Sequence, residues 1–451
     1  MKRLLIILLL TSIGLGSYAQ QAAPVTVHNF SLQDCINYAY EHQDSVKNSI
    51  LDVKSAEYKI KETIGSGLPQ INGSATFQDY LRTPTSVAPK GLFTGNPDFN
   101  APLVAFPIGA VKYNNTYSLT GNQLLFSGTF LVGLQAAKTY KELSERSLVR
   151  SKIQTKVNVT KAYYQVLVSN EQIRLLDANI AQLKLQLDQT TEQNKQGFVE
   201  KIDVDRLTVQ YENLVTNRAN IVRSLVLSAQ MLKFQMGMPI TEEISLTDKL
   251  ESVNLDQHAA DKIDTSFYRS RVEYNLLETN VKLNQLDVKS KMAAFLPTFS
   301  ANAGFAGVYQ ENHLKYLFYH PYPYSFIGLS LNIPIFTGGQ HINQLRQSQI
   351  SVEKAKNDLF NVKNALSLEA SAAQITFTNS LESLNTQKRS RELAQEVLRV
   401  SKVKYQQGVG SSIEVTQAQT ELESADNQYI QALYNALISK VDLDKAYGRI
   451  Q

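Results

Sequence analysis

The chain carries two copies of one sequence pattern, about 211 residues apart, and this duplication constrains the possible fold more than any single motif. Several landmarks occur in the same order in both halves. The paired segments are 68–69 with 296–297, 126–128 with 336–338, 195–204 with 406–415, and 236–237 with 447–448. One unit that occurs twice in a single chain indicates two structural repeats with a pseudo-twofold arrangement.

The amino terminus has the pattern of a secretory signal peptide. Two basic residues precede an apolar stretch at 4–10, and a site of small residues ends at Ala19. We therefore expect residues 1–19 to be removed and the mature chain to begin at Gln20. The chain has one cysteine, Cys35, so an exported chain would have no intramolecular disulfide. No later segment offers 18 consecutive apolar residues, so insertion into a membrane would use strands.

Each half is predicted to contain two strands between helices. A capped helix over 31–64 begins at Ser31 and leads to alternating polar and apolar residues over 71–81 and 112–126. In the second half the same alternation covers 298–309 and 325–333. The connection at 82–111 is rich in Pro and Gly and predicts a long exposed loop, whereas the connection at 310–323 is rich in aromatic residues. Each strand has about the 9–11 residues that a tilted membrane strand needs, but four strands cannot close a barrel.

The rest of the chain is predicted to form long helices. From 129 to 195 the sequence has roughly 67 helical residues, which at about 1.5 Å per residue give a rod of about 100 Å. Apolar and small residues recur every seven positions and indicate coiled-coil seams. The series in the first half are Ala162, Ser169, Leu176, Leu183, Thr190 with Val166, Ile173, Ile180, Leu187, and after the reversal Val204, Tyr211, Arg218, Leu225, Leu232 with Leu207, Leu214, Ile221; in the second half they are Val415, Leu422, Tyr429, Ala436, Leu443 with Ala418, Ala425, Ala432.

Composition and motifs argue against several function classes. The formal net charge of +4 falls by two when Lys2 and Arg3 are removed, which is too small for a typical nucleic-acid-binding protein. None of the six histidines has metal-ligand spacing or a neighbouring nucleophile. The glycine-rich segments 65–67 and 408–410 do not complete a phosphate-binding motif. We therefore expect no catalytic site, no metal and no cofactor.

These segments together resemble the TolC-type outer membrane efflux channels. The resemblance rests on the start at 31–39, the Leu-Pro pairs, the segment 334–339 and the two glycine-containing reversals, and it covers residues 30–450. It implies an α+β membrane protein: a homotrimer whose twelve strands form one outer-membrane β-barrel, continuous with a long α-helical coiled-coil barrel in the periplasm of a Gram-negative bacterium. It also implies an efflux function, in which cargo passes from a periplasmic adaptor protein and an inner-membrane transporter to the exterior.

The duplication and the predicted elements also indicate a domain organisation. After the signal peptide, the first repeat covers 20–238, with a β-hairpin at about 70–126 and a helical tip near Gly197. A linker at 239–264 joins it to the second repeat at 265–451, with a β-hairpin at about 297–335 and a tip near Gly408. The alternative, a structural or adhesive trimeric surface protein with a coiled-coil stalk, would use the loop 82–111 for contact.

Two kinds of site follow from the resemblance. Family members narrow the periplasmic end of the tunnel, and the matching aperture positions are Asp203, Tyr405 and Glu414. The chain has Gly410 where an arginine bridges in the family, and Gln417 at a further acidic position. For Asp203 and Glu414, stabilisation of a helix amino terminus by an acidic side chain is the alternative role.

The reversals themselves are the second site. They place small and apolar residues at the ends of long polar rods, which suits a contact with the hairpins of an adaptor; these residues are Gly197, Phe198, Val199, Gly408, Val409 and Gly410. In the alternative reading the glycines serve the turns alone, and Phe198 packs against its own hairpin.

Overall fold

The computed structural model describes residues 28–90, 100, 102–107, 111–248, 250 and 267–450. The predicted signal peptide at 1–19 lies outside these residues. The described chain divides into two compact units. We call them the sheet unit (51–146 and 273–362) and the hairpin unit (28–50, 147–272 and 363–450), and each combines segments of both halves of the sequence.

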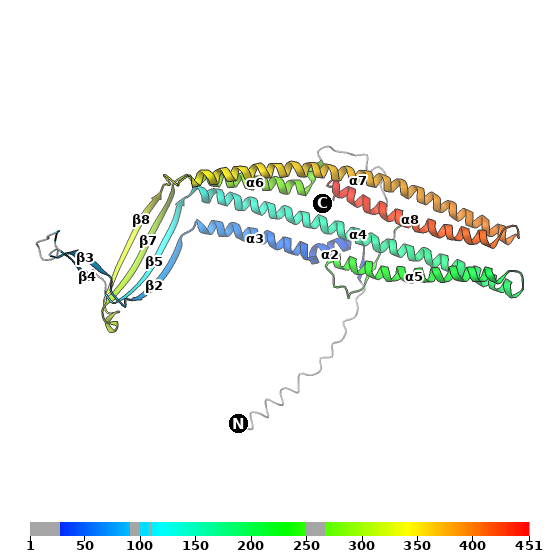
Figure 1. The fold of residues 1–451 in the computed structure, drawn as a ribbon, viewed down its shortest axis with the longest axis horizontal. Helices are drawn as coiled ribbons and strands as arrows, with labels where there is room; N and C mark the ends of the chain where they lie inside the picture. Colours follow the sequence, from blue (N-terminus) through cyan, green and yellow to red (C-terminus); the bar gives the residue numbers. More distant parts are fainter. Residues whose placement is uncertain are drawn as a thin grey trace, which may run out of the picture. The chain divides into compact units, whose positions relative to one another are not determined.

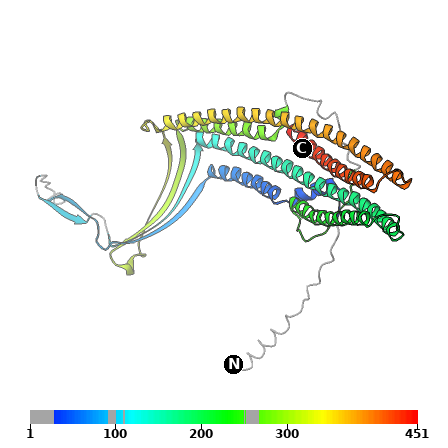
Figure 2. The same ribbon diagram turned by 45° about the vertical axis from the view of Figure 1, so that its right-hand side comes forward.

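The sheet unit contains one antiparallel sheet of four strands in the order β2-β5-β7-β8, visible as a single layer in two views (Figures 1 and 2). The strands are β2 (Gln70–Asp79), β5 (Tyr113–Phe126), β7 (Thr298–Glu311) and β8 (Pro321–Asn332). All four predicted strands are therefore present. Their lengths of 10, 14, 14 and 12 residues exceed the expected 9–11 in three cases.

The pairing register separates the sheet into an apolar and a polar face, as the alternation predicted. Residues directly opposite each other share a face, for example Ile71 with Gly121, and Gly121 with Ala303. The apolar face carries mainly Ile71, Gly73, Ala75, Phe77, Tyr117, Leu119, Ala301, Ala303, Phe305, Ile327, Leu329 and Leu331. The polar face carries Asn72, Ser74, Thr76, Gln78, Asn114, Thr116, Ser118, Thr120, Asn122, Ser300, Asn302, Gly304, Ala306, Val308, Gln310, Tyr322, Tyr324, Phe326, Gly328 and Ser330.

The connections differ in part from the prediction. The segment 82–111 was expected to be a loop, but it contains a short hairpin of β3 (Thr85–Pro89) and β4 (Leu103–Pro107). Pro84 and Pro102 directly precede these strands, and Pro89 and Pro107 are their last residues. Residues 91–99, 101 and 108–110 lie outside the described part. In the connection between β7 and β8, η3 (Leu314–Tyr316) forms a single 3₁₀ turn.

The hairpin unit is built on two helical hairpins. In the first, α4 (Gly128–Lys195) reverses into α5 (Lys201–Met236), and in the second α7 (Gln340–Gln406) reverses into α8 (Ser412–Ala446); α4 and α7 also extend into the sheet unit. The expected seven-residue seams are present. Leu176, Leu183, Leu187, Leu207 and Leu214 form the buried seam of the first hairpin, and Ala394, Leu398, Val415, Ala418, Leu422 and Ala425 that of the second.

A further core joins the amino-terminal helix to both hairpins. Here β1 (His28–Phe30) pairs in parallel with β6 (Ile244–Leu246), a contact that the sequence did not suggest because 239–264 was expected to be a linker. Residues 249 and 251–264 lie outside the described part. Asp248 accepts hydrogen bonds from the Tyr163 hydroxyl (2.7 Å) and the Leu32 amide (3.1 Å). Burial in this core raises the pKa of the Cys35 thiol to about 12.

The prediction of one helix over 31–64 is confirmed for its capped start at Ser31 but is wrong in expecting a single continuous helix. Ser31 and Asp34 form the capping box. The helix then breaks at Gln43, so that α2 (Leu32–His42) and α3 (Asp44–Ser66) are separate. In the second half, η2 (Phe267–Ser270) and α6 (Val272–Ala293) occupy the corresponding part. We attribute the break to tertiary packing, because Gly237 at the end of α5 lies directly against the backbone of His42 and Gln43.

Four glycines end helices with the same geometry. Gly197, Gly237, Gly408 and Gly448 have φ values of 79°, 72°, 74° and 66°. At each one the amide of the following residue donates to a carbonyl five positions earlier, as Phe198 donates to Gln193 and Val409 to Lys404, both at 3.0 Å. These are Schellman caps, and their positive φ favours glycine. They form two pairs in the two halves, which confirms the duplication.

These caps generate a prediction about stability. A Cβ at Gly237 would lie 2.7 Å from the His42 carbonyl oxygen, whereas a Cβ at Gly197 would meet nothing within 4 Å. Both Gly237→Ala and Gly197→Ala carry the left-handed penalty of roughly 1–2 kcal/mol. We expect Gly237→Ala to lower the melting temperature of the detergent-solubilised protein further than Gly197→Ala does, because only the first substitution adds a clash. Equal melting temperatures for the two variants would contradict this packing.

Candidate functional site: the helical tips and the groove between the hairpins

The two reversals lie at the same end of the hairpin unit (Figures 1 and 2) and expose apolar side chains. Phe198 is 80% exposed and Val409 is 78% exposed. Phe198 therefore does not pack away against its own hairpin. Val199 is half-buried, and its carbonyl accepts a hydrogen bond from the Asn194 side chain at 2.7 Å. Both tips thus present an apolar side chain directly after a rigid helix cap.

Two further apolar residues extend the tips. Ile202 and Ile413 are the second residues of the returning helices α5 and α8 and are 50% and 55% exposed. They occupy matching positions in the two repeats, so the duplication itself could have identified them. Together, Phe198, Ile202, Val409 and Ile413 form an exposed apolar cluster, which we call the tip cluster.

Asp203 connects the two hairpins. It lies in the first turn of α5, and its carboxylate accepts a hydrogen bond from the hydroxyl of Ser412 in the first turn of α8. It also forms an ion pair with Arg206 at 3.6 Å on its own helix. The side chain is only 18% exposed. Asp203 therefore does more than place negative charge at a helix amino terminus.

Tyr405 and Glu414 have different surroundings. Tyr405 packs against the seam of α7 and α8, and burial, with a smaller contribution from the charge of Asp203, raises the pKa of its hydroxyl. Glu414 is exposed, and its backbone amide donates to the Ser411 hydroxyl at 3.2 Å. Within the described ranges, the Glu414 carboxylate has no hydrogen-bond or ion-pair partner. The structure thus brings Asp203 near Tyr405 and leaves Glu414 in the position of a helix-stabilising acid.

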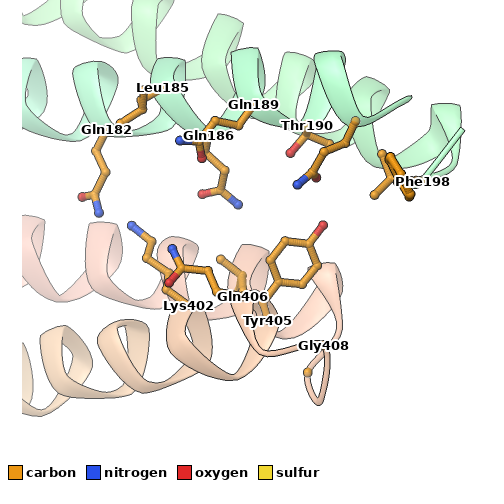
Figure 3. A pocket seen from close by; sticks show the side chains of 14 residues that line it. Gln182, Leu185, Gln186, Gln189, Thr190, Phe198, Lys402, Tyr405, Gln406 and Gly408 are labelled. Atoms are coloured by element: carbon orange, nitrogen blue, oxygen red, sulfur yellow. The ribbon is translucent and has the colours of Figure 1, made fainter. Parts of the chain in front are cut away.

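A groove of about 750 Å³ separates α4 from α7 and the start of α8 (Figure 3). Glutamines dominate the wall that α4 contributes, and Lys402, Tyr405 and Gln406 project from α7 toward it. Burial lowers the pKa of the Lys402 ammonium, which has no ion-pair partner in the described part of the chain. The α4 wall comprises Gln182, Leu185, Gln186, Gln189, Thr190 and Gln193. The lining of the groove is mixed, with the glutamines and Lys402 beside Leu185, Val199 and Val415, and the groove opens beside Phe198 and Gly408.

Polar contacts also link the hairpins away from the tips. Asn179 of α4 donates to Asp426 of α8 at 3.3 Å, and Asp426 also accepts from Arg391 of α7 at 2.6 Å. Gln210 of α5 donates to the Thr420 hydroxyl of α8 at 3.0 Å. Sequence reasoning missed these residues, because their positions differ in no visible way from other polar positions on a long helix. Toward the tips the apolar seams lie within each hairpin and the links between hairpins are hydrogen bonds. Nearer to α2 the two hairpins also share an apolar core.

Other classes of site find no support in the described residues. Within them, no group of three or more His, Cys, Asp or Glu side chains could hold a metal ion. No helix in the same residues has both the length and the apolar character to cross a membrane.

Comparison with known proteins agrees with this geometry. Residues 35–237 and 277–449 match the family described as Outer membrane efflux protein. The chain is 24% identical to outer membrane protein TolC of Escherichia coli K12 over 309 residues, which cover 65% of this chain and 61% of that protein. It is 23% identical to TolC of Salmonella enteritidis over 462 residues, covering 100% of this chain and 87% of that protein.

A solved structure shares the fold. The open state of the Neisseria gonorrhoeae MtrE outer membrane channel superposes with a TM-score of 0.72 at 17% identity, covering 92% of this chain and 88% of that one. The match to the family model, at residues 35–237 and 277–449, extends over most of the chain.

The chain therefore belongs to the outer membrane efflux protein family, and it is an outer membrane protein of the efflux class.

The hairpin unit yields a prediction about pH. Burial, and then the charge of Asp426, raise the pKa of Glu423. A raised carboxyl pKa means that stability is present at low pH and is lost as pH rises through the folded-state pKa. Glu423→Gln should therefore raise the melting temperature at pH 7.5, and this gain should vanish near pH 4, about the ordinary pKa of glutamate. Thermal unfolding at both pH values measures the effect, with exposed Glu421→Gln as the control; a gain that is larger at pH 4 would contradict it.

Proposed function

We propose that this chain is one subunit of a homotrimeric outer-membrane channel, which passively conducts cargo delivered by a periplasmic adaptor and an inner-membrane transporter. The observation that carries the proposal is the sheet of four strands, whose edge strands β2 and β8 each have one side without a strand partner in the described residues. In lipid, unpaired backbone groups at a strand edge cost several kcal/mol each, so only a closed barrel is viable. Several copies must therefore pair edge to edge, and three copies supply twelve strands.

The two faces of the sheet support this assembly. Large apolar side chains on one face are exposed, with Ile327 at 88% and Leu329 at 70%. The opposite face carries hydroxyl and amide side chains. In the proposed barrel the apolar face meets lipid and the polar face lines a water-filled lumen. An adhesive stalk would not need a sheet with one apolar and one polar face. A conductance measurement distinguishes the adhesive function from the channel function.

We further propose that the ends of the helical hairpins form the periplasmic aperture and dock the adaptor. Asp203 has the geometry for a latch, because one carboxylate joins the first turns of α5 and α8 through Ser412. Polar links can be exchanged for water at small net cost, so the tip ends of the hairpins, which such links join, can separate. The proposal assigns the chain no catalytic step, which agrees with a family and a structural neighbour that are outer membrane channels.

The first test is electrical. The purified mature protein should have the mass of a trimer in detergent and form pores of low conductance in planar bilayers. Asp203→Ala removes the bridge between α5 and α8 and should raise the single-channel conductance. Glu414→Ala, which removes a carboxylate without a described partner, should leave the conductance unchanged. If the two acids act only on helix amino termini, both variants will have the same conductance. A purified protein that is a monomer and conducts no ions would refute the channel function itself.

The second test concerns the tip cluster. The double variant Phe198→Asp/Val409→Asp keeps both cap glycines but places charges in the proposed apolar contact with the adaptor. Export by cells at native expression should fail, while trimer yield and bilayer conductance remain normal, because burial of an unpaired charge is costly. The matched variant Phe198→Leu/Val409→Leu keeps apolar tips and should export normally. Undiminished export by the aspartate variant would exclude the tips as the docking surface.

A further inference from the structure

The polar face of the sheet has an aromatic strip along one strand. Tyr322, Tyr324 and Phe326 alternate along β8 and are 60%, 54% and 49% exposed. Their partners on β7 are Val308, Ala306 and Gly304, which places the three rings on the polar face. Because side chains on one face recur every second residue, the rings follow one another at about 7 Å along the strand.

At least one ring lies flat on the sheet. A Cβ at Gly304 would be 2.5 Å from a ring atom of Phe326, so the ring covers the glycine backbone and turns its other side away from the sheet. Covering of a strand glycine by an aromatic ring is a known stabilising arrangement, and it accounts for Phe326. It does not account for Tyr322 and Tyr324, whose partners on β7 are not glycines.

The remainder of the polar face is neutral. In the four described strands it carries Ser, Thr, Asn and Gln side chains but no Asp, Glu, Lys or Arg. The acidic residues of these strands, Asp79 and Glu311, are both paired with Tyr113 and fall on the other face. Some hydroxyls bond across strands, as Ser74 and Ser118 do at 2.8 Å. A charged solute therefore finds no opposite charge on this face.

We propose that the aromatic strip, with its neutral polar surroundings, is a contact surface for uncharged cargo whose rings have a flat apolar side and a polar edge. This inference rests on the proposed function, in which the polar face lines the lumen. Stacking on Tyr322, Tyr324 and Phe326 supplies the attraction for the flat side of the ring. Hydroxyl and amide groups on the neighbouring strands supply hydrogen bonds for the polar edge. Sugar rings and polar-edged aromatic rings share this chemistry.

The test measures block of single trimeric channels in planar bilayers, with maltoheptaose or chloramphenicol added on the side of the strand connections. Wild-type channels should show transient, concentration-dependent block. Tyr322→Ser/Tyr324→Ser should weaken the block about ten-fold, since aromatic pairs contribute about 0.5–1.5 kcal/mol each and 1.4 kcal/mol is a factor of ten. The Tyr322→Phe/Tyr324→Phe variant keeps the rings, so the probes should block it as strongly as they block the wild type.

The matched control is Tyr319→Ser, which changes a somewhat more exposed tyrosine (67%) in the connection between β7 and β8 and should leave the block unchanged. If the serine pair does not assemble, Tyr324→Leu keeps an apolar side chain without the ring and should still weaken the block. Block by one probe alone supports the inference and assigns the ring type. Two results would overturn this inference but not the proposed function: wild-type channels that conduct but are blocked by neither probe, or a serine double variant that is blocked as strongly as the wild type. Trimers that carry no pore current would instead overturn the proposed function.

Discussion

Backbone hydrogen bonding at the edges of the four-stranded sheet is the constraint on which the assembly depends. Within the sheet each inner strand pairs on both sides, but β2 and β8 each have one edge without a partner in the described chain. In water such an edge can bond to solvent, whereas in lipid it cannot. In the proposed channel a single subunit would therefore have no viable state in the membrane, and folding of the barrel would be coupled to association. The apolar and polar faces acquire their roles only when the sheet closes.

The helical hairpins combine two kinds of contact with different consequences. Leucine and alanine seams are buried within each hairpin and stabilise it by removing apolar surface from water. Between the hairpins, the contacts of Asp203 with Ser412 and of Asp426 with Asn179 are polar. Opening such contacts to water costs less than opening an apolar seam. The tip ends of the hairpins are thus suited to separate, as the proposed aperture requires, whereas the apolar core with Val166, Leu167 and Leu437 holds the two hairpins together farther from the tips.

The tips and the sheet share one physical feature, the exposure of apolar side chains. Both expose apolar side chains that a soluble monomer would bury, at Phe198 and Val409 in one place and at Ile327 and Leu329 in the other. In each case local geometry is rigid: Schellman caps hold the tips, and ladder hydrogen bonds hold the strand. Rigid exposed apolar groups favour association because little conformational entropy remains to be lost.

The sequence by itself determined the features that depend on local periodicity. Alternation of two gives the strand faces, a repeat of seven gives the seams, and glycine gives the reversals at Gly197 and Gly408, because each signal lies within a few turns or residues of the chain. The duplication pairs these elements, and the expected exposure of Phe198 and Val409 followed from their place at the reversals.

Only the tertiary structure decided the contacts between segments distant in the chain. The helix breaks at Gln43, where Gly237 packs against the backbone, and β1 pairs with β6. Asp203 in the first repeat accepts a hydrogen bond from Ser412 in the second. These residues are ordinary polar or small residues in their local sequence. Their roles come from neighbours that folding brings together, and no local pattern records such neighbours.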